Sequence, residues 1–120
     1  MSIEQFLVQL QTQPESIAFG QTIETINANY DYSPTRFTNG AGPDAVINAV
    51  GSNEGSCRIF AFALLQSLST EATLALFGSF YRDDVLKHPQ ATDHANIRTF
   101  MKYGWAGIHF DGAALSPKQV

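Results

Sequence analysis

The sequence lacks several features that would place a protein in a special class at once. Cys57 is the one cysteine among 120 residues, so no disulfide can form within the chain. No apolar run approaches the roughly 18 residues that a membrane-spanning helix needs. No Lys or Arg precedes Arg36, so the basic start of a secretory signal and an Arg-rich presequence are both missing. These absences predict a cytoplasmic protein without membrane insertion.

Positive charge is scarce as well. Seven Lys and Arg face 11 Asp and Glu, which gives a formal net charge of −4 and a pI near 5.1. The first 60 residues contain only two of the basic residues and six of the acidic ones, so the net charge lies in that half. Nucleic acids and anionic membranes bind basic surfaces, so we expect neither as a partner.

The residues that are present indicate one folded domain covering residues 1–120. Hydrophobic residues make up 44% of the chain and charged residues 15%, which excludes a disordered protein. A chain of this length buries roughly two thirds of its unfolded surface, enough for a core without disulfides or metals. Nine Phe, four Tyr and one Trp must either fill that core or line a binding surface.

Hydrophobic spacing and capping residues predict about five helices. Ser2 opens a capping box for a helix that ends before Pro14, and a second helix runs from Pro14 to Asn29. A buried helix is expected over residues 57–68, and another from Ser69 or Thr70 to just before Pro89. A last helix, capped by Thr92 or Asp93, ends at Gly104.

Short strands are expected at residues 36–38, 46–50 and 108–110, the last running into a hairpin-type turn at Asp111-Gly112. The fold class is therefore α+β, mostly helical, with a small antiparallel sheet of two to three short strands. Helical spacing assigns six aromatic residues to the core: Phe6, Phe19, Phe60, Phe77, Tyr81 and Phe100. Five fall in loop and strand regions, where we expect a binding surface: Tyr30, Tyr32, Phe37, Trp105 and Phe110.

One polar stretch that could carry chemistry precedes the buried helix. Asn53, Glu54 and Arg58 are candidate ligand-binding residues there, and Cys57 lies in the first helical turn. A helix N-terminus and the neighbouring Arg58 both lower the pKa of a thiol, so a reactive thiolate is one hypothesis. The plain alternative is that Cys57 is a small buried hydrophobic residue.

A second polar stretch runs from Asp83 to Arg98. Together with Cys57, His94 and Asp93 would supply a nucleophile, a base and an orienting group, and Asn96 and Arg98 are further ligand-binding candidates. The plain alternative makes Asp93 a helix cap and leaves His94 at the surface. Spacing alone does not predict a metal site here, because the i, i+4 pair Asp84 and His88 supplies only two ligands; we expect no metal and no cofactor.

Several motifs occur in an order typical of one bacterial family. They are Phe37-x-Asn39-Gly40, Asn53-Glu54-Gly55-Ser56-Cys57, Tyr81-Arg82-Asp83-Asp84-Val85-Leu86, Asp93-His94-Ala95-Asn96-Ile97-Arg98, Gly104-Trp105-x-Gly107-Ile108 and Phe110-Asp111-Gly112. In these the chain resembles the HopJ type III effector protein family from about Phe6 to Leu115. The resemblance implies export by a type III secretion system but no enzymatic activity, cofactor or catalytic residue. Residues 1–13 favour a capped helix over a Ser-rich export leader, so a resident cytoplasmic role stays open.

Three functions are compatible with these observations. The first is an interaction domain that binds a protein partner, and we prefer it to an enzyme. The second is a small enzyme or metabolite-binding domain with a polar pocket around Cys57 and His94. The third is a structural domain in which Arg58, Asp83, Asp84 and Arg98 form buried or half-buried ion pairs that hold helices and loops together. Convergence of the two polar stretches on one open cleft would favour the second.

Overall fold

The computed structural model describes residues 2–118, and this part of the chain has the expected α+β fold, mostly helical. Its helices are α1 (Ile3–Thr12), α2 (Phe19–Asn29), α3 (Glu54–Leu65), α4 (Thr70–Ala75), the π-helix η3 (Phe80–Val85) and α5 (Ala95–Tyr103). The capping box at Ser2 and the helix end at Gly104 are confirmed. Pro14 begins a separate 3-10 turn, Pro14–Ser16, so α2 starts later than expected.

The strands form two small antiparallel sheets. They are β1 (Tyr30–Tyr32), β2 (Phe37–Asn39), β3 (Val46–Asn48), β4 (His109–Phe110) and β5 (Leu115–Pro117). One sheet has the order β3-β2-β4, in agreement with the three expected strands. The other pairs β1 with β5, which no sequence pattern predicted. Asp111-Gly112 does not close a hairpin, because β4 pairs with β2 and the Asp111 N–H donates to the Arg36 carbonyl.

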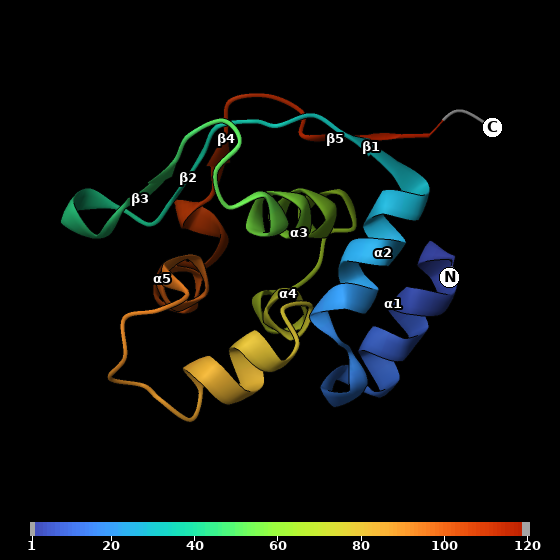
Figure 1. Ribbon diagram of the computed structural model, residues 1–120, viewed down its shortest axis with the longest axis horizontal. Helices are drawn as coiled ribbons and strands as arrows, with labels where there is room; N and C mark the ends of the chain where they lie inside the picture. Colours follow the sequence, from blue (N-terminus) through green and yellow to red (C-terminus); the bar gives the residue numbers. More distant parts are fainter. Residues whose placement is uncertain (1, 119–120) are drawn as a thin grey trace.

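Figure 1 shows the strands lying along one side of the molecule and the helices gathered beneath them. Helix α3 occupies the centre, α1 and α2 pack together at one end, and α5 lies under the three-stranded sheet at the other. The π-helix η3 and the loop after it lead from α4 to α5 along the edge opposite the strands. No helix within residues 2–118 is long and apolar enough to cross a membrane.

Aromatic rings form much of the core. The Phe60 ring on α3 packs against Phe77, Phe100 and Trp105, with ring centroids 4.9 to 6.3 Å apart. The expectation that Phe37 lies at a binding surface is wrong: it is fully buried and stacks on Phe110 at 5.0 Å. Tyr30 is 7% exposed and is also a core residue. The Tyr30 and Phe37 rings pack against Phe62 and Phe60 of α3 at 6.0 and 5.9 Å, so these two strand residues complete the core instead of forming a surface.

The expected helix over residues 70–88 is broken in two. Helix α4 ends at Ala75, and Gly78 adopts a left-handed φ of 61° before η3 begins. A Cβ atom on Gly78 would lie 2.6 Å from the backbone nitrogen of Phe19. The break lets the chain pass against the start of α2, a contact between distant segments that helical periodicity cannot show.

Candidate functional site

The two polar stretches meet at one pocket of about 340 Å³. Asn53, Gly55 and Ser56 line it from the start of α3, and residues 94–97 line it from the start of α5. Phe19, Phe77 and Phe80 supply apolar wall. This volume lies at the lower end of the range for sites that take small molecules.

Both helices begin at the pocket in the same unusual way. Asn53 and His94, the residues that precede α3 and α5, have left-handed φ angles of 51° and 52°. Neither side chain caps its helix. The prediction that Thr92 or Asp93 caps the last helix is wrong, because His94 occupies the N-cap position of α5. Within residues 2–118, the Cys57 and Arg98 N–H groups donate to the Asn53 and His94 carbonyls, and no acceptor is found for the backbone N–H groups of residues 54–56 and 95–97. Free N–H groups at a helix start favour negative charge, so the pocket has two such ends.

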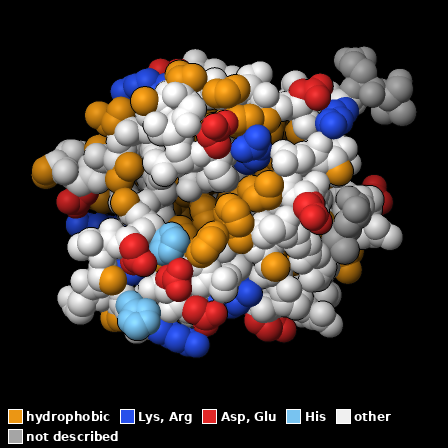
Figure 2. All heavy atoms as spheres, in the orientation of Figure 1, with side chains coloured by type: hydrophobic (Ala, Val, Ile, Leu, Met, Phe, Trp, Pro, Cys, Tyr) orange, Lys and Arg blue, Asp and Glu red, His pale blue; other side chains and the backbone are white. Residues whose placement is uncertain are grey.

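The opposite wall of the pocket is aromatic. The Phe19 and Phe80 rings meet edge to face at 4.9 Å, and the Phe80 ring lies 5.0 Å from the His94 imidazole. Figure 2 shows hydrophobic side chains gathered in a hollow beside a histidine on this face of the molecule. Phe80 is 36% exposed, which is high for a ring of this size. The site thus combines an apolar surface with polar groups, as ligand pockets do.

Buried asparagine side chains hold the two helix starts together. The Asn48 Oδ1 accepts from Asn53 Nδ2 at 2.7 Å and from Asn96 Nδ2 at 2.9 Å. Asn39 Nδ2 donates to the Asn96 carbonyl at 2.8 Å. Asn39 and Asn48 are fully buried and Asn96 nearly so. A buried network of this kind fixes the backbone around the pocket, because breaking any member leaves a polar group unpaired.

Cys57 does not face this pocket. It is 1% exposed, and its thiol donates to the Thr35 carbonyl at 3.5 Å. Burial raises the pKa of the Cys57 thiol, which opposes the thiolate that a nucleophile requires. The hypothesis of a Cys57, His94 and Asp93 catalytic set therefore has no support from the geometry.

Glu54 and Arg58 also lie outside the pocket lining. The Arg58 Nε donates to the Asn27 side chain at 3.1 Å, and its guanidinium lies 3.9 Å above the centre of the Tyr32 ring. Within the described part of the chain Arg58 forms no ion pair, unlike the expectation of the structural hypothesis.

Arg98 organises the loop before α5. Its guanidinium donates to the Asp93 carbonyl at 2.6 Å, the His88 carbonyl at 3.0 Å and the Asp93 carboxylate at 2.7 Å. This hydrogen bond holds the pKa of Asp93 below its usual value. Asp83 forms a separate pair with Lys87 whose side chains are 54% and 70% exposed, so it is not a half-buried pair of the predicted kind. The Arg98–Asp93 pair, with the Arg98 side chain 17% exposed, is one.

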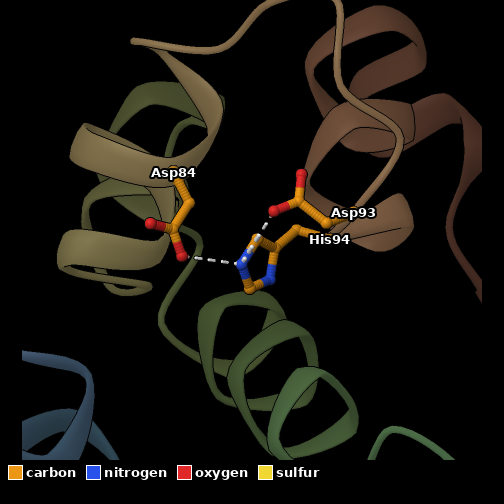
Figure 3. Close-up of side chains that lie close together, drawn as sticks. All are labelled: Asp84, Asp93 and His94. Atoms are coloured by element: carbon orange, nitrogen blue, oxygen red, sulfur yellow. Dashed lines mark hydrogen bonds and ion pairs between the residues drawn. The ribbon is translucent and has the colours of Figure 1, made fainter.

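Asp84 reaches His94 instead of the sequence neighbour His88. Figure 3 shows Asp84 and Asp93 pointing toward the same side of the His94 imidazole, with Nε2 to carboxylate oxygen distances of 2.9 and 3.8 Å. The sequence did not predict the contact between Asp84 and His94, because tertiary packing brings η3 and the loop before α5 together. It did not predict the aromatic wall of the pocket either, because Phe19 and Phe77 occupy ordinary core positions in the helical pattern.

These features define an α+β domain with a ligand-sized pocket between the starts of two helices. A family model described as HopJ type III effector protein matches residues 3–115, and the chain belongs to this HopJ family. A solved structure described as "Crystal structure of unknown function protein VPA0580" is similar, with 52% identity and a TM-score of 0.93. The match covers 98% of this chain and 95% of that one. None of the curated proteins matches the chain.

Proposed function

We propose that this chain is a binding domain that takes a small organic anion in the pocket between α3 and α5. The observation that carries the proposal is the convergence of both polar stretches, around Asn53 and His94, on that pocket. The helix starts favour a carboxylate or phosphate group, and the Phe19 and Phe80 rings favour an apolar or aromatic portion of the same ligand. Burial of Cys57 removes the evident nucleophile, so binding accounts for the site better than catalysis does.

Ligand-observed NMR with phenyl phosphate, benzoate and inorganic phosphate tests this proposal. We expect phenyl phosphate to bind more tightly than inorganic phosphate, because only the former has a ring to pack against Phe80. Ser56→Leu places a larger side chain in the lining and should weaken binding at least tenfold. Ser116→Leu, on exposed β5, is the matched control and should bind as wild type does. Equal affinity in both variants, or no binding by any probe, would count against the pocket.

A protein partner is the second candidate, and a different surface favours it. Leu64 and Leu65, at the end of α3, are 48% and 53% exposed beside a groove of about 180 Å³ lined mainly by apolar residues. Exposed apolar residues grouped in this way mark interaction surfaces. A photo-crosslinker at residue 65 should capture a partner in cells, and Leu64→Asp should abolish capture while Ser56→Leu leaves it unchanged.

Delivery by a type III secretion system is a separate part of the proposal, supported by the family description. It does not depend on either binding surface. A translocation reporter fused after Val120 should give a signal in recipient cells only when the secretion apparatus is intact. A signal that persists without the apparatus would contradict this route.

A further inference from the structure

We propose that Asp84, Asp93 and His94 form a binding site for one divalent transition-metal ion, with Zn²⁺ the best fit. The imidazole nitrogen and the two carboxylate oxygens all lie within 4.8 Å of one another. The site does not depend on the pocket ligand, although His94 belongs to both.

The spacing of the donor atoms suits a small adjustment toward tetrahedral coordination. Zn²⁺ binds nitrogen and oxygen ligands at about 2.0 to 2.2 Å, which places neighbouring ligand atoms about 3.3 to 3.6 Å apart. The Asp84 oxygen is 2.9 Å from His94 Nε2 and would move outward, whereas the Asp93 oxygen at 3.8 Å would move inward. Rotation of exposed carboxylates supplies both movements without a change in the backbone.

Charge also favours a cation at this position. Arg98 donates to Asp93 Oδ1, and the other carboxylate oxygen of Asp93 faces His94. One Nε2–H can donate to one oxygen at a time, and at 2.9 Å that oxygen belongs to Asp84. With a neutral imidazole, two carboxylates and one guanidinium leave a net negative charge. In the other neutral tautomer the proton is on Nδ1, and a metal ion could then bind Nε2, compensate that charge and engage both carboxylates together.

Neighbouring groups hold the ligands in place. The Phe80 ring packs 5.0 Å from the imidazole, and Arg98 fixes the loop through the His88 and Asp93 carbonyls. Supporting contacts of this kind orient metal ligands in proteins. The His94 side chain is 27% exposed and the carboxylates about half exposed, so water can complete the coordination shell.

The donor set predicts the order of metal preference. One imidazole with two carboxylates suits Zn²⁺ and Co²⁺, whereas Ca²⁺ and Mg²⁺ prefer oxygen ligands alone. We therefore expect Zn²⁺ to raise the melting temperature of the wild-type protein, and an equal concentration of Mg²⁺ to leave it unchanged.

Titration of the full chain with Co²⁺, followed by visible absorption, together with calorimetry with Zn²⁺, tests the site. Wild type should bind one equivalent, and Asp84→Asn and His94→Asn should each weaken binding at least tenfold. Asparagine tolerates the left-handed backbone at residue 94, so this variant removes the imidazole with little strain. The matched controls Asp83→Asn and His88→Asn change the same residue types outside the cluster and should bind within twofold of wild type.

Absence of saturable one-equivalent binding to the wild type would overturn the proposal. So would an Asp84→Asn variant that binds as tightly as wild type, or a His88→Asn variant that loses as much affinity as His94→Asn. If circular dichroism shows that His94→Asn is unfolded, Asp84→Asn and Asp93→Asn decide the outcome. The probes are metal ions alone, so failure here would leave the pocket proposal standing.

Discussion

The start of α3 and the start of α5 have the same backbone geometry but opposite surroundings. Asn53 and His94 each enter a helix from a left-handed conformation without capping it. Beyond Asn53 the chain passes at once into the core, where Cys57 is sealed, whereas the loop before His94 is held by ion pairs at the surface. The buried asparagine network joins both sides of the pocket, and the α5 side has surface ion pairs in addition. We expect perturbations of the two sides to differ accordingly.

The largest expected difference is in the reactivity of Cys57. Because the thiol is buried and its pKa is raised, its reaction with a disulfide reagent at pH 8 should be at least about a hundredfold slower than in the unfolded chain. Absorbance of the released thiolate gives the rate with and without urea. A native rate equal to the unfolded rate would show that the start of α3 is open.

Removal of the Asn48 side chain, at the centre of the buried asparagine network, should destabilise the protein strongly. Asn48→Ala leaves the Nδ2 groups of Asn53 and Asn96 without an acceptor, at a cost of about 2 to 4 kcal/mol in the free energy of unfolding. Urea denaturation measures the loss. Asn27→Ala, an exposed position, is the matched control and should cost much less. Similar losses of stability for both variants would show that the asparagine network does not stabilise the fold.

Removal of the Arg98 side chain should affect the charged side to a smaller extent. Arg98→Ala breaks hydrogen bonds to the Asp93 and His88 carbonyls, and we expect a loss of about 1 to 2 kcal/mol. Hydrogen exchange should rise in the loop between η3 and α5 before it rises in α3. Lys87→Ala removes an exposed pair and should leave stability and exchange near wild type.

The smallest expected effect is a pH-dependent surface contribution. Lys102 and Tyr103 donate to Asp44 at 2.7 and 2.6 Å, and these bonds lower the pKa of its carboxyl group. A lowered pKa in the folded state means that the stabilisation is complete above the ordinary value of 3.8 and is lost as the pH falls through the folded value. Melting temperatures of wild type and Asp44→Asn should therefore differ slightly at pH 6 and converge at low pH. A difference in melting temperature that grows as the pH falls would contradict the lowered pKa of Asp44.

Local sequence was sufficient for the parts of the fold that local interactions decide. The Ser2 capping box, the Gly104 helix end and the strand around Phe37 were predicted because their signals lie within a few residues. The break at Gly78 was not, since it serves a contact with Phe19 about 60 residues away in the chain. The pairing of β1 with β5 was not predicted either, because it also joins segments that are far apart in the chain.

The candidate site was also predicted only in part from the sequence. Asn53, His94 and Asn96 stood out as polar residues beside buried helices, and they line the pocket. Cys57 was a reasonable nucleophile by position, but no pattern shows which face of a helix turns inward when nearly all of its residues are apolar. The approach of Asp84 to His94 depends on the path of the chain between η3 and α5, which spacing alone does not determine.

The most direct test of the account is amide NMR mapping of phenyl phosphate binding to the wild-type chain. If the pocket between the two helix starts is the binding site, the N–H signals of Gly55, Ser56 and Ile97 should move first and saturate together. Signals of α1, which contributes no residue to the pocket lining, should remain in place. Saturable shifts confined to other surfaces, with these three signals unmoved, would contradict the central claim.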